Sequence, residues 1–109
     1  MTDSKIAGKA MRLAELVDYR DGSIVSRALR EGDSGTMTLF AFAAGQGLSE
    51  HSAPFDAFVQ ILEGEATVML AGKPIKTAAG DMVLMPANVP HALAGPGAFK
   101  MLLTMFRSA

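Results

Sequence analysis

Two histidines, His51 and His91, are the residues of this chain whose chemistry is easiest to identify. Their imidazoles titrate near neutrality, exchange protons and bind transition metals. The chain contains no cysteine, which excludes disulfides, thiolate catalysis and zinc–thiolate sites. A metal ion would therefore need nitrogen or oxygen ligands, and the two histidines are the first candidates.

Each histidine lies in a segment punctuated by glycine and proline. Residues 45–64 contain His51 and end on Glu63-Gly64, and residues 80–91 run from Gly80 through Pro86 to His91. The first segment resembles the first motif of the cupin superfamily: glycine, five residues, His-x-His, three or four residues, Glu, six residues and glycine. The second resembles the family's second motif, in which glycine, five residues and proline lead through a tight turn to histidine. Fifteen residues separate the two motifs, a spacing similar to that of small one-domain cupins.

The resemblance implies one divalent metal ion, Fe, Mn, Ni, Cu or Zn, held by three histidines and a glutamate. His51 and His91 stand at the first and last of these positions, whereas Ala53 and Ala57 replace the second histidine and the glutamate. Half of the family's ligand set is therefore absent. Gln60 is a possible additional ligand, but a regular strand would point it away from Ala57, so that it requires a bulge.

The two alanines predict a roomier and more apolar pocket than a four-ligand site would leave, suited to a small and partly apolar molecule. We expect five residues to line it: Ala53, Ala57, Val59, Met82 and Met101. Asp56 is interpreted as a local turn cap. Asn88 stands where the family usually has glycine, and asparagine tolerates the positive φ of such a turn.

Short apolar stretches separated by turn residues favour an all-β fold over alternating strands and helices. We predict strands at residues 24–29, 37–43, 57–62, 66–70, 75–78, 82–85 and 99–106. Together with the cupin resemblance, this pattern predicts a jelly-roll (double-stranded β-helix) barrel of six to eight strands. Residues 10–17 can form only a short amphipathic turn of helix.

A chain of 109 residues is long enough for one domain. We expect an N-terminal arm at residues 1–22 and a single barrel domain at residues 23–109. Half of the residues are hydrophobic and the formal net charge is -1, so the sequence predicts neither a nucleic-acid partner nor a membrane partner. Without the unbroken apolar run of a signal peptide in residues 1–16, we expect a cytoplasmic protein.

Residues 36–43 and 99–106 are apolar on both strand faces. One barrel interior can bury only one of these faces, which predicts a homodimer.

Two functions remain open. The first is a cupin barrel that binds or senses a small molecule without turnover, with His51 and His91 contacting a polar handle of the ligand or sharing a metal. The second is a metal-dependent enzyme of small-molecule metabolism, an oxygenase, isomerase or lyase. A plainer alternative is that the two imidazoles are structural and are satisfied by backbone groups or by each other.

Overall fold

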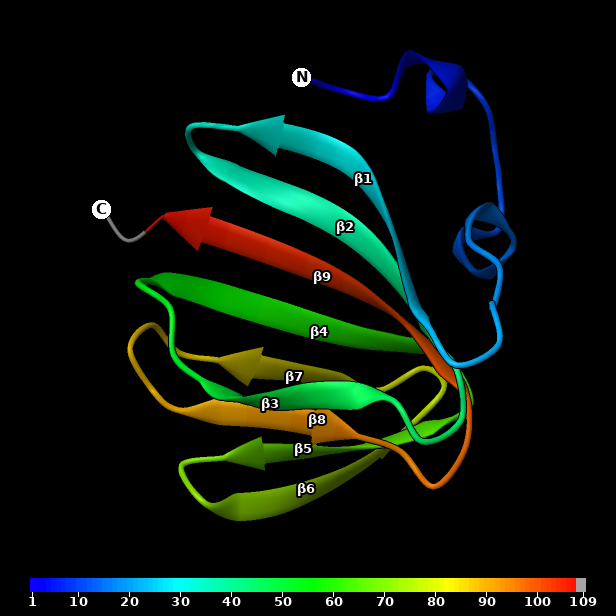
Figure 1. The fold of residues 1–109 in the computed structure, drawn as a ribbon. Helices are drawn as coiled ribbons and strands as arrows, with labels where there is room; N and C mark the ends of the chain where they lie inside the picture. Colours follow the sequence, from blue (N-terminus) through cyan, green and yellow to red (C-terminus); the bar gives the residue numbers. More distant parts are fainter. Residues whose placement is uncertain (108–109) are drawn as a thin grey trace.

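The computed structural model describes residues 1–107, which form two antiparallel β-sheets that face each other (Figure 1). The larger sheet has the strand order β1-β2-β9-β4-β7 and the smaller sheet the order β3-β8-β5-β6. The strands are β1 (Ile24–Gly32), β2 (Gly35–Phe42), β3 (Gly47–His51), β4 (Phe55–Glu63), β5 (Glu65–Leu70), β6 (Lys73–Ala78), β7 (Met82–Met85), β8 (His91–Ala94) and β9 (Phe99–Arg107).

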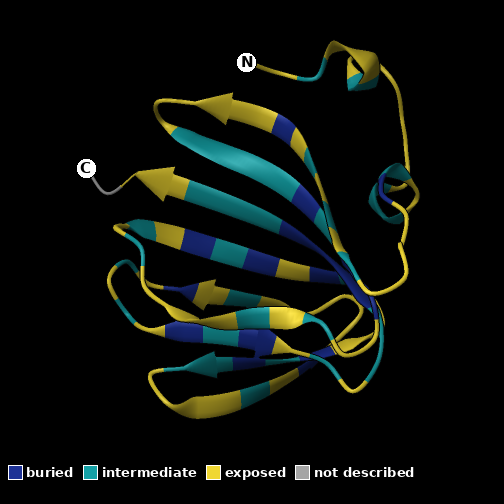
Figure 2. Ribbon diagram, viewed as in Figure 1, coloured by how far each residue is buried: buried dark blue, intermediate teal, exposed yellow. Residues whose placement is uncertain are grey.

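The main core lies between the two sheets and follows from the alternation of side chains along each strand. In β4 the residues Ala57, Val59 and Ile61 are buried, whereas Gln60 between them is exposed. Figure 2 shows this alternation along β4. The buried core residues are Phe42, Ala57, Val59, Ile61, Ala66, Val68, Met85, Leu93, Phe99 and Met101.

Gly64 forms the corner at which the chain leaves the larger sheet at the end of β4 and enters the smaller one as β5. Its φ is +78°, and a Cβ placed there would lie 2.4 Å from the carbonyl oxygen of Ala98. Both the backbone conformation and the close approach of the neighbouring chain therefore require glycine. Asn88 has a φ of 65°, which confirms the positive φ predicted for the turn before His91.

Four connections, β1–β2, β3–β4, β5–β6 and β7–β8, lie at the same end of the molecule, on the left in Figure 1. His51 is the last residue of β3 and His91 is the first residue of β8. Because β3 and β8 are antiparallel neighbours in the smaller sheet, this topology brings two residues that are far apart in the sequence to one edge of the sheet pair.

The residues before β1 lie against the outer face of the larger sheet and contain two short 3-10 helices, η1 (Ser4–Ile6) and η2 (Leu13–Leu16). A second apolar cluster forms there, in which Val17 packs with Leu39 and Leu102 of the sheet. Lys100 is buried on this face, and its Nζ donates a hydrogen bond to the carbonyl oxygen of Ala14 at 2.6 Å. The N-terminal segment therefore covers part of the second apolar face of β2 and β9.

The predicted all-β jelly roll is confirmed. The two sheets do not close into one hydrogen-bonded ring among residues 1–107, and nine strands are present there instead of six to eight. The sequence prediction missed β3 and β8, the two strands that carry the histidines. Within these residues, no helix is both long and apolar enough to cross a bilayer.

Candidate functional site

The two histidines form a direct side-chain contact. His51 and His91 are cross-strand partners in the β3–β8 pair, and a register shift between Leu48 and His51 precedes this contact. Their Nε2 atoms lie 3.1 Å apart, and the ring planes meet at 67° with centroids separated by 4.3 Å. His91 is buried, with 7% of its surface exposed, whereas His51 is exposed at the edge.

Each ring is oriented by the same kind of contact, which runs from Nδ1 to the backbone carbonyl oxygen two residues earlier. Nδ1 of His51 lies 2.8 Å from the carbonyl oxygen of Ser49, and Nδ1 of His91 lies 3.2 Å from that of Val89. A carbonyl oxygen only accepts hydrogen bonds, so both of these contacts are hydrogen bonds when each Nδ1 carries the proton and donates it. In the neutral form of each ring, Nε2 is then an acceptor with a free lone pair.

Two neutral imidazoles in these tautomers direct two lone pairs at each other, and no hydrogen bond joins them. A proton on one Nε2, a hydrogen-bond donor from a ligand or a metal ion would turn this repulsion into attraction. Both contacts of the structural alternative are present, one from each ring to the backbone and one between the rings, but with both protons on Nδ1 the contact between the rings has no donor. The geometry therefore favours an electropositive group at the two Nε2 atoms.

Burial is the main reason why the pKa of His91 lies below its ordinary value of 6.5. The hydrogen bond to the Val89 carbonyl opposes this shift, and the neighbouring His51 adds to it because two imidazolium ions would repel each other. His91 is consequently held in its neutral, lone-pair form near neutral pH.

A cavity of about 280 Å³ lies beside the two histidines, between the sheets. Apart from the two imidazoles, every residue that lines it is apolar: Phe40, Leu48, Ala53, Phe55, Ala57, Met85, Leu93, Met101, Leu103 and Met105. The volume is close to the lower limit for small-molecule pockets. The cavity thus combines one polar end with an apolar body.

The structure brings together five of the residues singled out from the sequence, because His51, His91, Ala53, Ala57 and Met101 all line the cavity. Val59, predicted to line the pocket, does not. It points inward as Ala57 does, but its side chain is completely buried in the core.

Two further expectations are wrong. Gln60 and Met82 are cross-strand partners on the outer face of the larger sheet, where both are exposed. No bulge precedes Gln60 in β4, so the alternation from Ala57 keeps it outside. In β7, Val83 packs on the core and Met85 is buried within it, which leaves Met82 on the opposite face.

Asp56 also differs from its interpretation as a local cap. Its Oδ1 accepts a hydrogen bond from the backbone N–H of Ala87 at 2.9 Å, across 31 residues of sequence. The carboxylate ties the start of β4 to the turn before His91. It therefore helps to position the turn that precedes the second histidine.

Two methionines of the cavity wall, Met85 and Met105, were not among the five residues expected to line the pocket. Both are cross-strand partners of Ala57, one from β7 and one from β9. They flank the position where the family pattern has glutamate. The alternation in residues 82–85 and 99–106 could have identified them, once Met85 was assigned to the same face as Ala57.

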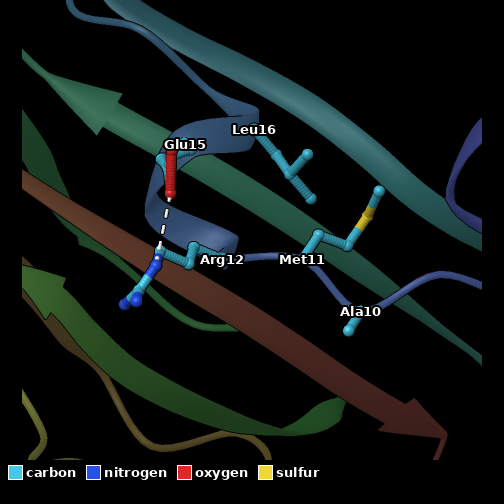
Figure 3. A pocket seen from close by; sticks show the side chains of 5 residues that line it. All are labelled: Ala10, Met11, Arg12, Glu15 and Leu16. Carbon is cyan, nitrogen blue, oxygen red and sulfur yellow. Dashed lines mark ion pairs between the residues drawn. The ribbon is translucent and has the colours of Figure 1, made fainter.

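A second hollow, at the N-terminal arm, contains no histidine. The depression beside the N-terminal arm is lined by Ala10, Met11, Arg12, Glu15 and Leu16, as Figure 3 shows. Its charged pair, Arg12 Nε and Glu15 Oε2 at 3.7 Å, is exposed to solvent. Such a pair contributes little binding energy.

The two histidines have the spacing of metal ligands but form only half of a ligand set. Two nitrogens bonded to one ion at about 2.0–2.1 Å, about 95–100° apart, would have the observed separation of 3.1 Å. Within residues 1–107, however, no group of three or more histidine, cysteine, aspartate or glutamate side chains could hold a metal. The three-histidine and glutamate set implied by the sequence resemblance does not fit this site.

Comparison with known proteins gives a consistent result. The family profile described as "Cupin domain" matches residues 38–106. A conserved protein of unknown function from Streptococcus pyogenes superposes with a TM-score of 0.89 at 33% identity, covering 94% of this chain and 90% of that one. A cupin superfamily protein from Desulfitobacterium hafniense superposes with a TM-score of 0.88 at 34% identity, with 93% of each chain covered. No curated protein matches the sequence.

Proposed function

The chain belongs to the cupin family, and on this premise we propose that it binds a small, mainly apolar molecule whose polar handle donates a hydrogen bond. The handle contacts Nε2 of His51 and of His91, and the apolar body occupies the cavity between the sheets. One observation carries this proposal: both Nδ1 atoms lie at backbone carbonyls, which leaves both Nε2 atoms as acceptors.

The wall of the cavity supports binding by shape and burial of apolar surface. The three methionines Met85, Met101 and Met105 can adapt to the shape of a ligand because their side chains are unbranched and polarisable. Ala53 and Ala57 leave open the space that larger side chains would fill. Burial of an apolar ligand body in such a cavity supplies most of the affinity, and the imidazoles set the orientation.

We also propose that the ligand is bound without being chemically changed. The composition of the cavity wall supports this part of the proposal. Among the described residues that line the cavity, none has a carboxylate, a hydroxyl or an amine. Acid–base chemistry there would depend on the two histidines alone. The alternative of a metal-dependent oxygenase, isomerase or lyase would require ligands that the positions of Ala53 and Ala57 do not supply.

Phenol, benzylamine and benzoate test the proposal, because they share a ring but differ in the polarity of the handle. Protein with labelled methionine methyl groups is titrated with each probe above neutral pH and followed by NMR. We expect phenol and benzylamine to shift the Met85, Met101 and Met105 resonances saturably, while Met82, exposed on the outer face, stays unchanged as an internal control. Benzoate, which only accepts hydrogen bonds, should bind at least tenfold more weakly.

Two variants identify the cavity as the binding site. Ala57→Leu places a side chain in the cavity and should abolish the methyl shifts, and His51→Ala should weaken binding of phenol at least tenfold. Equal binding of benzoate and phenol would overturn the assignment of the Nε2 atoms as acceptors. If no probe shifts the cavity methyl groups at millimolar concentration, the cavity does not bind this class of molecule.

A further inference from the structure

A smaller hollow, the rim hollow, opens beside the histidine cavity and shares part of its wall. Its volume is about 80 Å³, and it is lined by Gly32, Asp33, Gly35, Thr36, Phe55, Met105 and Arg107. Phe55 and Met105 line both the rim hollow and the histidine cavity. The two spaces are therefore adjacent, and one ligand can reach both.

Strand pairing explains why the residues of the rim hollow meet. Thr36 is the cross-strand partner of Met105, and Phe55 is that of Arg107. Phe55 begins β4 and Arg107 ends β9, while Asp33 belongs to the connection between β1 and β2. These positions lie at the end of the two sheets where β3 ends and β8 begins (Figure 1). The rim hollow is thus at the same end of the molecule as the two histidines.

The hydroxyl of Thr36 lacks a hydrogen-bond partner. Its Oγ1 is buried, and no other group within residues 1–107 bonds to it. Along β2, Thr36 has the same parity as Phe40, which lines the histidine cavity, so its side chain is on the inner face of the sheet. A buried hydroxyl without a partner costs free energy, and rotation about the Cα–Cβ bond re-aims it without moving the strand. A polar ligand group in the rim hollow would supply the missing partner.

Two opposite charges border the rim hollow. Asp33 and Arg107 both line it and are exposed, and neither forms an ion pair or a side-chain hydrogen bond with another residue of the described chain. A guanidinium binds a carboxylate through parallel hydrogen bonds, and a carboxylate binds an ammonium group. A ligand group with a single charge would be attracted by one of these side chains and repelled by the other. A head group that carries both charges is attracted by both.

We propose that the rim hollow binds the zwitterionic head group of an aromatic α-amino acid whose side chain lies in the histidine cavity. The carboxylate of the ligand contacts Arg107 and the Thr36 hydroxyl, and its ammonium group contacts Asp33. A hydroxyl on its ring is the donor to the Nε2 atoms of His51 and His91. The proposal rests on the proposed function, because the ring occupies that cavity, and it narrows the ligand to a hydroxyl-bearing aromatic amino acid.

Four probes that share a para-substituted phenol test this site. The first, para-ethylphenol, has no charge, tyramine has an ammonium group, para-hydroxyphenylpropanoate has a carboxylate, and tyrosine has both. Each is titrated slightly above neutral pH, and the labelled methyl group of Met105, which lines both spaces, reports the dissociation constant. We expect tyrosine to bind about fivefold more tightly than para-ethylphenol, since each exposed ion pair adds little, and the two singly charged probes to gain less.

Three variants test the role of each polar group. Arg107→Gln, Asp33→Asn and Thr36→Val should each weaken binding of tyrosine about threefold and leave binding of para-ethylphenol unchanged. Thr36→Val should not lower the melting temperature of the ligand-free protein, because it removes a buried hydroxyl that has no partner. Arg12→Gln removes an exposed cation at the N-terminal arm, and as the matched control it should bind both probes as the unchanged protein does.

Failure of the head-group site is distinguishable from failure of the proposed function. The site is overturned if tyrosine binds no more tightly than para-ethylphenol, or if Arg107→Gln or Asp33→Asn leaves its affinity unchanged. The proposed function stands in that case when para-ethylphenol still shifts the cavity methyl groups. Tyrosine binding that depends on Arg107 but is unaffected by His51→Ala would support the head-group site and overturn the contact with the imidazoles.

Discussion

At the scale of single residues, His91 shows how the fold fixes both the orientation and the charge of a side chain. The Val89 carbonyl sets its tautomer, and burial lowers its pKa below the ordinary value. Asp56 reaches the same turn through the N–H of Ala87. The imidazole is consequently neutral and directed at His51 before any ligand arrives, so that little orientational entropy is lost on binding.

The lowered pKa of His91 predicts a dependence of stability on pH. The unfolded chain takes up a proton at this histidine near the ordinary pKa of 6.5, whereas the folded chain does so only at lower pH. The unfolded state therefore binds more protons in the window just below pH 6.5, and the free energy of unfolding falls as the pH is lowered through it. Above that window His91 is neutral in both the folded and the unfolded chain, so its contribution to the free energy of unfolding is fully retained.

Urea unfolding measured at a series of pH values checks this prediction against His91→Gln, which cannot titrate. The variant should lose less stability between neutral pH and the range where carboxylates begin to protonate. Identical pH dependence in the two proteins would show that burial does not oppose protonation of His91.

The candidate site was predictable from the sequence only where a motif fixed the backbone. His51, His91, Ala53 and Ala57 were identified because glycine and proline spacing placed them. Gln60 was offered as a ligand only through a bulge that β4 does not have before it. The mutual contact of the two histidines depends on the register of β3 and β8, which the sequence pattern did not contain.

At the scale of elements, glycines with positive φ form corners where the chain changes sheet or reverses within one sheet. Gly64 and Gly72 have nearly the same φ, +78° and +79°, but different surroundings. A Cβ at Gly64 would meet the Ala98 carbonyl oxygen at 2.4 Å, whereas a Cβ at Gly72 would meet nothing within 4 Å. Alanine substitutions at these two glycines therefore separate the free-energy cost of a positive φ from that of a steric clash.

We predict that Gly72→Ala lowers the free energy of unfolding by about 1–2 kcal/mol, the cost of a left-handed conformation for a residue with a Cβ. Gly64→Ala also forces the β8–β9 connection to move, and it should lower the free energy of unfolding by roughly 3 kcal/mol or more. Chemical denaturation of both variants provides the measurement. The assignment of Gly64 as a sterically required corner would be wrong if it tolerated alanine as well as Gly72 does.

Most strands were predictable, because their apolar residues alternate between turns. Both β3 and β8 escaped prediction for a physical reason: β8 has only four residues, too few to show a pattern, and β3 has five residues of which only Leu48 is a large apolar one. Their pairing with each other, and that of β8 with β5, arises from tertiary context and not from local preference.

At the scale of the whole molecule, the second apolar face of the larger sheet is only partly covered. The N-terminal segment packs on β2 and β9 through the cluster that includes Leu16, Val17 and Leu102. Farther along the same face, Phe58 and Phe106 contact each other with ring centroids 5.9 Å apart. Phe106, Met82 and Leu84 remain 51%, 54% and 44% exposed.

The homodimer predicted from the sequence would bury this remaining surface, centred on Phe58, Leu84 and Phe106. Sedimentation equilibrium should give twice the chain mass of 11.4 kDa, and Leu84→Lys, which places a charge in the middle of the patch, should shift the protein to monomer. Lys76→Glu on the smaller sheet is a control for charge alone. A monomer at high micromolar concentration in the unchanged protein would contradict the prediction.

Binding of a hydrogen-bond donor in the cavity requires that the fold present two unprotonated Nε2 atoms there. Nitrogen-15 NMR of the histidine rings, recorded well above neutral pH in metal-free protein, measures the protonation of each ring nitrogen separately. We expect His51 and His91 both to carry their proton on Nδ1, and phenol to shift both Nε2 resonances in the direction of a donated hydrogen bond. A neutral ring with its proton on Nε2 in either histidine would contradict it.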